Sequence, residues 1–358
     1  MTLLRIPCTI IFSFIIVVSL TATEASAQTG VIAFDDGCTG LLYAMRGDGS
    51  GRIELPLPPR PLPTNEYCYR QPRVLDVTTS GPLTVVYYVG ISRQDSLELV
   101  DYGLFAVQLN DVGGMLTSDL PERLDLPLIA GVNPNRARNG SFSLTGDRLA
   151  LAAGTVLMTG KVERDAALKI IGLSDLVVVL PDPGFPTLQG FTGTFDFSPD
   201  GTSIVASINA DLWMIDLNAN HTFLGAERLT ENTDGFAEWN PSFSPDGSRI
   251  AYTAGPITNS GGVRDAEIYS LTLAPRSVLQ VTTNRNKGEA NSRNNAMWTA
   301  DSARIGFTGH TSRTPRGSPC SGLVNTEIFL IKADGSITAT KITNTNGTSV
   351  EARPKWGW

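Results

Sequence analysis

Short apolar runs recur along the chain, and each follows a turn built from Pro, Asp and Gly. Ile204-Val-Ala comes after Phe197-Ser-Pro-Asp-Gly201, and Ile250-Ala-Tyr comes after Phe243-Ser-Pro-Asp-Gly247. Asp and Gly suit a tight hairpin, because Gly adopts positive φ without steric cost. Degenerate copies of the phrase are Phe142-Ser-Leu-Thr-Gly146 before Leu149 and Trp298-Thr-Ala-Asp301 before Ile305. A strand–turn–strand phrase that returns at intervals predicts a repeat architecture.

Each repeat continues with two further β-type segments. An aromatic and aliphatic stretch follows the apolar run, as in Glu267-Ile-Tyr-Ser-Leu or Glu327-Ile-Phe-Leu-Ile, and a last strand ends in Val281-Thr-Thr or Ile342-Thr. Short β-rich runs bounded by turn residues are the signature of strands. The repeat therefore predicts a blade of four strands, A to D, with the Pro-Asp-Gly turn between A and B.

The repeats account for almost the whole chain of 358 residues. Five units lie at 70–121, 139–181, 191–230, 237–284 and 294–344. The C-terminal segment 350–358 has the pattern of a lone strand A, and residues 30–55 have that of strands B, C and D. Together they complete a sixth blade, which removes exposed sheet edges. We predict an all-β, six-bladed β-propeller of four-stranded antiparallel blades, closed by pairing of the N- and C-terminal strands, as a single domain over 28–358.

The repeat resembles that of the TolB-like propeller family. The motif is matched at Pro241-Ser-Phe-Ser-Pro-Asp-Gly247 with Glu267-Ile-Tyr269, and Tyr43-Ala-Met-Arg-Gly-Asp-Gly49 matches the stretch between strands C and D. The resemblance implies the propeller fold, and it implies a cell-envelope lipoprotein of the Pal type as a candidate partner. The chain departs from TolB in having no room for the N-terminal α/β domain. Because many unrelated activities use this fold, the resemblance does not specify the function.

The N-terminus has the features of a signal peptide over residues 1–27. Arg5 precedes an apolar stretch from Ile10 to Leu20, and Ala25-Ser-Ala27 is a small-residue cleavage site. That stretch is short for a membrane span. We therefore expect a soluble periplasmic or secreted protein that begins near Gln28, with no membrane segment in the mature chain. The net charge of −7 argues against nucleic-acid partners.

Three cysteines remain after cleavage, namely Cys38, Cys68 and Cys320. An odd number in an oxidising compartment predicts one disulfide bond and one free or intermolecular thiol. Cys38–Cys68 is the first choice, since both residues flank one blade. Cys38–Cys320 is the alternative and would join the two ends of the ring of blades.

Candidates for catalysis are few, and we predict no catalytic residue and no bound cofactor. The recurring Asp200, Asp246 and Asp301 are interpreted as caps of their own hairpins, and His221 and His310 as surface residues of a turn and a loop. No Gly-x-Ser-x-Gly nucleophile turn occurs. The alternative is a lactonase-type site with a divalent metal in the central channel, for which the candidate ligands are Asp196, Glu238 and Asn240.

Loop lengths indicate one face of the propeller for binding. The long connections predicted between strands B and C are 90–101, 155–166, 255–266 and 309–326, and those between D and A are 57–70, 122–138 and 285–293. Both classes lie on the same face, here called the long-loop face, and binding sites are common on long loops carried by a rigid scaffold.

One sector of this face is basic, which predicts an acidic ligand such as a peptide or polysaccharide. Its residues are Arg285, Lys287, Arg293, Arg313 and Arg316. The sequence therefore favours an exported, non-enzymatic propeller scaffold that binds a protein or peptide partner through the long-loop face. The alternative is a metal-dependent carbohydrate- or lactone-active enzyme with its site in the central channel.

Overall fold

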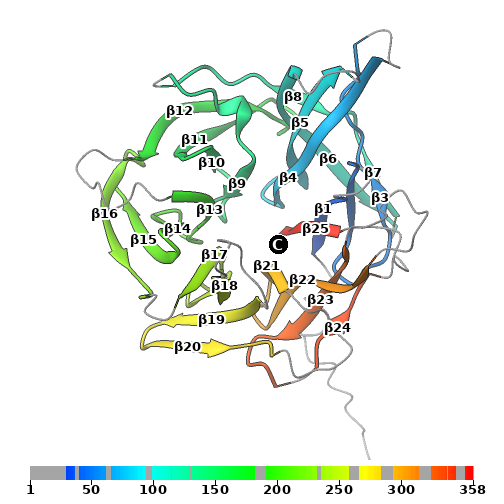
Figure 1. Ribbon diagram of the computed structural model, residues 1–358. Coiled ribbons are helices and arrows are strands. Elements are labelled where there is room, and N and C mark those ends of the chain that lie inside the picture. Colours follow the sequence, from blue (N-terminus) through cyan, green and yellow to red (C-terminus); the bar gives the residue numbers. More distant parts are fainter. Residues whose placement is uncertain are drawn as a thin grey trace, which may run out of the picture.

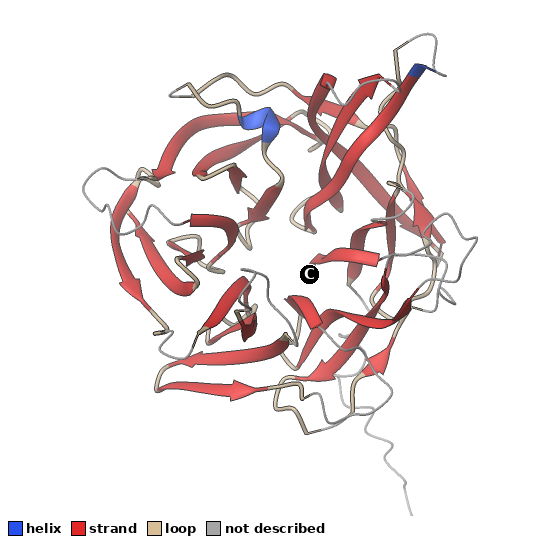
Figure 2. Cartoon of the chain, in the orientation of Figure 1, coloured by secondary structure: helices blue, strands red, loops and turns tan. Residues whose placement is uncertain are grey.

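The computed structural model shows six antiparallel sheets arranged as a ring, with almost no helix (Figures 1 and 2). It describes residues 30–36, 40–61, 66–93, 99–113, 115–129, 131–181, 191–231, 235–257, 266–283, 293–313, 324–336, 338–343 and 351–357. The prediction of a six-bladed β-propeller with four-stranded blades is confirmed. The predicted signal peptide, residues 1–27, lies outside the described residues. Within them, no helix is long and apolar enough to cross a membrane.

Four of the sheets take four consecutive strands each. Blade 3 contains β9 (Asn139–Phe142), β10 (Arg148–Ala153), β11 (Val156–Arg164) and β12 (Ile170–Leu180). Blade 4 contains β13 (Phe191–Phe197), β14 (Ser203–Ile208), β15 (Asp211–Leu217) and β16 (Phe223–Arg228). Blade 5 contains β17 (Phe236–Phe243), β18 (Arg249–Pro256), β19 (Glu267–Leu273) and β20 (Arg276–Gln280). Blade 6 contains β21 (Arg293–Trp298), β22 (Arg304–Arg313), β23 (Val324–Lys332) and β24 (Thr340–Lys341).

Blade 1 joins segments from the two ends of the chain. Its strand order is β25-β1-β2-β3, with β25 (Glu351–Gly357), β1 (Val31–Asp36), β2 (Leu42–Arg46) and β3 (Ile53–Glu54). β25 pairs antiparallel with β1, so that Val31 lies opposite Gly357. The C-terminal strand is therefore the innermost strand of this blade, next to the centre of the ring (Figure 1).

Blade 2 has a divided outer strand. It contains β4 (Tyr67–Thr78), β5 (Thr84–Arg93), β6 (Leu99–Val112), β7 (Met115–Ser118) and β8 (Glu122–Leu124). The end of β6 pairs with β7, whereas its middle, at Leu104–Ala106, pairs with β8. The segment 122–138 is therefore not wholly a loop, because it contains β8 and the short 3-10 helix η2 (Pro134–Arg136).

Three of the four connections predicted between strands B and C are shorter than expected, whereas 255–266 agrees with the end of β18 at Pro256 and the start of β19 at Glu267. Residues 155–166 were predicted as a loop, which is wrong: β11 occupies Val156–Arg164, and only Gly154 and Thr155 separate it from β10. Gly154 has a φ of 66°, which allows this tight turn. In 90–101 and 309–326, strand also replaces much of the predicted loop, since β5 ends at Arg93 and β22 at Arg313. Unbroken apolar patterning across a turn hides it from sequence analysis.

The hydrophobic core lies between neighbouring blades. One cluster combines Leu157 of blade 3 with Phe195, Phe197 and Ile204 of blade 4. Equivalent clusters fill the other blade interfaces, including one around Trp298 and Phe307 of blade 6 against blade 5. Continuous apolar strands such as β1, β5 and β14 therefore pack both of their faces against neighbouring sheets around the ring.

Candidate functional site

The repeated aspartates cap their own hairpins. Asp246 Oδ1 accepts hydrogen bonds from Ser244 Oγ (2.6 Å) and from the backbone N–H of Ser248 (2.9 Å). Partial burial of Asp246 acts to raise its pKa, but these hydrogen bonds outweigh that effect and lower the pKa. Asp200 and Asp301 cap their turns in the same way. The interpretation of these carboxylates as turn caps is confirmed.

The Glu and Thr positions of the repeat form a second structural unit. Thr343 Oγ1 donates to Glu327 Oε2 at 2.7 Å and accepts from the backbone N–H of Ile328 at 2.8 Å. Thr282 repeats this arrangement with Glu267 and Ile268. These hydrogen bonds tie residues of strand C to a threonine that follows strand D, which explains why Glu-Ile-Tyr and Val-Thr recur together.

Blade 4 uses a carboxylate from a different strand for the same unit. Thr230 Oγ1 accepts from the N–H of Leu212 at 2.9 Å and donates to Glu238, which belongs to the first strand of blade 5. Asp211 stands at the usual Glu position and pairs instead with Arg228 at 2.7 Å. Burial raises the pKa of Glu238, partly offset by the hydrogen bond from Thr230. Glu238, a candidate metal ligand in the sequence, therefore substitutes for the missing glutamate of the repeat.

The innermost strands are joined by polar side chains at the centre of the ring. Asp76 accepts from the backbone N–H of Phe142 (2.6 Å), and Asp196 accepts from that of Phe243 (2.7 Å) and from Ser141 Oγ (2.6 Å). Each of these bonds links one blade to the next along the chain. The ammonium group of Lys355 interacts electrostatically with both carboxylates. These groups hold neighbouring blades together.

The electrostatics of Asp76 predict a pH-dependent stability. Burial raises its pKa from 3.8 to about 6, with a further increase from Asp196, despite the opposing charge of Lys355. The folded state then binds this proton more tightly than the unfolded state, so stability falls as the pH rises from about 4 to about 6 and is constant above that range. The raised pKa corresponds to a change of about 1–3 kcal/mol in the free energy of unfolding across this pH range.

Asp76→Asn should reduce this slope, because the substitution removes the titrating carboxyl group of Asp76. The amide oxygen of Asn can still accept from the backbone N–H of Phe142, so the link between the blades is kept. The measurement is the urea unfolding midpoint of the two proteins between pH 4.5 and 7.5. Asp334→Asn is the control, since hydrogen bonds from Ser336 lower the pKa of that exposed carboxyl. An unchanged slope in Asp76→Asn would contradict this assignment.

The three metal candidates of the alternative hypothesis are engaged in separate interactions. Asp196 bonds to Ser141 and Phe243, Glu238 bonds to Thr230, and Asn240 Nδ2 donates to Asn295 Oδ1 at 3.0 Å. Within the described ranges, no group of three or more His, Cys, Asp or Glu side chains is arranged to hold a metal ion.

The predicted basic sector falls mostly outside the described residues, as Arg285, Lys287 and Arg316 do. Arg293 begins β21 and Arg313 ends β22, so both lie at the strand ends of blade 6 that face the long-loop side. Their role in binding stays a prediction.

The histidine and cysteine predictions have mixed outcomes. His221 lies in the turn between strands C and D, as expected, whereas His310 lies within β22 opposite Thr326 and not in a loop. Cys68 is half-buried in β4 and forms no disulfide bond within the described part of the chain, and Cys38 and Cys320 lie outside that part. The Cys38–Cys68 disulfide and its alternative stay predictions.

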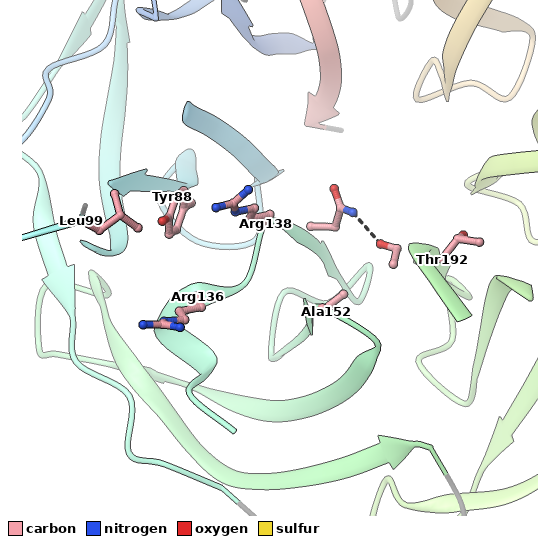
Figure 3. A pocket seen from close by; sticks show the side chains of 9 residues that line it. Tyr88, Leu99, Arg136, Arg138, Ala152 and Thr192 are labelled. Carbon is pink, nitrogen blue, oxygen red and sulfur yellow. Dashed lines mark hydrogen bonds between the residues drawn. The ribbon is translucent and has the colours of Figure 1, made fainter. Parts of the chain in front are cut away.

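A cavity of about 680 Å³ opens on the long-loop face between blades 2, 3 and 4. Its wall combines the middle of β5 and the ends of β6, β10 and β13 with the segment that leads from η2 into β9. Figure 3 shows Tyr88, Leu99, Arg136 and Arg138 on one side and Ala152 and Thr192 on the other. The described lining residues are Tyr88, Leu99, Arg136, Arg138, Asn139, Ala152, Gly154, Thr192 and Gly193.

Two arginines dominate the polar chemistry of this cavity. The guanidinium of Arg138 lies 5.5 Å from the centroid of the Tyr88 ring, and that of Arg136 lies 4.7 Å from the Tyr102 ring. At the opposite wall, Asn139 Nδ2 donates to the carbonyl oxygen of Gly193 at 2.6 Å, which links blade 3 to blade 4. The cavity therefore has a cationic side and a wall fixed by an inter-blade hydrogen bond.

Sequence analysis missed Arg136 and Arg138, although one signal marks them. They stand on either side of the buried Ala137, just before the first strand of a blade. The segment was interpreted as a long loop, and its neighbours in space, Tyr88 and Tyr102, belong to the preceding blade.

Comparison with known proteins concerns the fold. No protein-family model matches the sequence, and no curated protein matches it. A TolB candidate from Agrobacterium tumefaciens is 12% identical, with 92% of this chain and 98% of that chain covered and a TM-score of 0.47. A chain of a nidogen–laminin complex is 10% identical, with coverages of 91% and 98% and a TM-score of 0.49. An oligogalacturonate lyase from Vibrio parahaemolyticus is 11% identical, with coverages of 87% and 84% and a TM-score of 0.42.

Proposed function

We propose that this chain is an exported, non-enzymatic propeller scaffold of the TolB-like kind that binds a protein or peptide partner on its long-loop face. The observation that carries the proposal is the cavity of about 680 Å³ on that face, beside β5 and the ends of β10 and β13. A concave cavity of this volume is typical of a ligand-binding site. A cell-envelope lipoprotein is the candidate partner.

The chemistry of the polar groups supports binding over catalysis. The carboxylates of the repeats accept hydrogen bonds that cap turns, join strands C and D, or link one blade to the next, as Asp246, Glu327 and Asp196 show. Groups so engaged hold the ring of blades rigid. A rigid ring that presents loops and a cavity on one face is suited to the recognition of a partner.

Photo-crosslinking from the two faces tests this proposal. A photoreactive amino acid replaces Thr192, which is exposed at the cavity, or Asn220, which is exposed in a turn on the opposite face. Each mature protein is irradiated in envelope extract of the source cells. We expect a defined protein crosslinked from position 192 and none from position 220, and direct binding of that protein once purified.

Equal crosslinking from both positions, or no binding by the purified protein, would overturn the proposal. Both positions are polar and exposed, so differences in folding do not explain a difference in capture. Turnover of a sugar or lactone substrate, abolished by a chelator, would favour the enzyme hypothesis instead.

A further inference from the structure

Arg136 and Arg138 lack acidic partners within the part of the chain that the structure describes. Some arginines there pair with carboxylates, as Arg123 does with Asp101 and Arg276 with Glu227. Others donate to backbone carbonyl oxygens, as Arg164 and Arg249 do. The chain as a whole carries 35 Asp and Glu against 28 Lys and Arg, so acidic residues are in excess. Two such arginines line the same cavity.

The structure positions both guanidinium groups before any ligand arrives. Tyr88 is buried and supports Arg138, whose backbone N–H donates to the carbonyl oxygen of Ala152 at 3.1 Å. The hydroxyl of Tyr102, below Arg136, accepts from Asn133 Nδ2 at 3.1 Å. A guanidinium placed over an aromatic ring keeps its N–H donors directed outward in its own plane. Less side-chain entropy is then lost on binding.

A planar carboxylate is the acceptor that this arrangement fits. Arginine binds carboxylates through paired, parallel N–H···O bonds, which lysine cannot provide. The cavity is larger than a single anion requires, and apolar surface is added by Leu99 on the side of the arginines and by Ala152 on the other side. An acidic side chain next to an apolar one on a peptide satisfies both parts of the wall.

We infer that the cavity binds an acidic side chain of the partner's peptide, held by Arg136 and Arg138, with a neighbouring apolar side chain against Leu99 and Ala152. This inference rests on the proposed function and specifies what the partner presents. Because the charge interaction is solvent-accessible, binding should weaken as salt concentration rises.

Titration of the mature protein, labelled with ¹⁵N-arginine, tests the inference. The probe is the acetylated and amidated peptide Glu-Leu-Glu, and Gln-Leu-Gln is its matched neutral control. We expect the Nε–Hε signals of Arg136 and Arg138 to shift with Glu-Leu-Glu, and affinity for Gln-Leu-Gln to be lower by about tenfold or more. The double variant Arg136→Gln/Arg138→Gln should lose binding of Glu-Leu-Glu to a similar extent.

A double variant that removes two cations elsewhere, Lys161→Gln/Arg276→Gln, separates the site from net charge and should bind as the wild type does. Equal affinity for the two peptides, or undiminished binding by Arg136→Gln/Arg138→Gln, would overturn the inference. If the inference is overturned in either way but a partner is crosslinked at position 192, the proposed function still stands. Conversely, selective binding of Glu-Leu-Glu without a crosslinked protein would overturn only the proposed function.

Discussion

Replacing Trp298 with alanine should destabilise the propeller by about 3–5 kcal/mol, the range for loss of a large aromatic side chain from a core. Trp298 is only 1% exposed and lies in the cluster between blades 5 and 6. Its Nε1 donates to the carbonyl oxygen of Ser242 at 3.0 Å, and the Arg249 guanidinium lies 4.6 Å from its ring. Truncation would leave a cavity at the blade interface and remove both contacts.

Trp298→Phe provides the matched comparison, since Phe142, Phe197 and Phe243 occupy the equivalent position in other blades. It keeps most of the apolar volume but loses the hydrogen bond, so we expect about 1–2 kcal/mol. The measurement is the guanidinium unfolding midpoint and the thermal midpoint of each purified variant. Equal losses for the alanine and phenylalanine variants would show that the filled volume is not what stabilises this interface.

Thr343→Val should cost about 2–4 kcal/mol, because the two side chains have nearly the same shape but valine has no hydroxyl. The hydroxyl of Thr343 serves the backbone N–H of Ile328 and the carboxylate of Glu327, which is 1% exposed. Both groups lose a hydrogen-bond partner where water cannot readily replace it. Removing a partner from a buried charged group is more destabilising than the average hydrogen bond suggests.

Two further variants separate this hydrogen-bond loss from other effects of the substitution. Thr343→Ser keeps the hydroxyl and should retain most of the stability, whereas Thr340→Val changes an exposed residue of β24 and should have little effect. The measurement is the unfolding midpoint of each of the three variants at the same pH, which shows whether loss of the Thr343 hydroxyl causes the destabilisation. A Thr343→Val protein as stable as Thr340→Val would mean that the recurring Glu and Thr are not a stabilising unit.

The repeat made the fold predictable because its information is local. Phe197-Ser-Pro-Asp-Gly201 specifies a hairpin through its own side chains, and the continuous apolar run that follows indicates a strand buried on both faces. The predicted unit 191–230 accordingly matches β13 to β16. Prediction failed where such local signals were weak, as at 155–166, where apolar residues on both sides of Gly154 conceal a two-residue turn.

The candidate site could not be predicted in the same way, because its parts come from different blades. Arg138 belongs to the start of blade 3, Tyr88 to the second strand of blade 2 and Gly193 to the start of blade 4. Their proximity depends on how sheets pack around the ring. The role of Glu238 could not be predicted for the same reason, since its hydrogen bond with Thr230 crosses from one blade to the next.

The sequence by itself determined the number of blades, the four-strand repeat and the role of the turn aspartates, because hairpins and alternation depend on neighbouring residues. Only the tertiary structure decided which polar residues meet. It assigned Asp196 and Glu238 to hydrogen bonds between blades, and it placed Arg136 and Arg138 together in a cavity on the long-loop face. Such contacts arise from the closing of the ring, which brings together segments far apart in sequence.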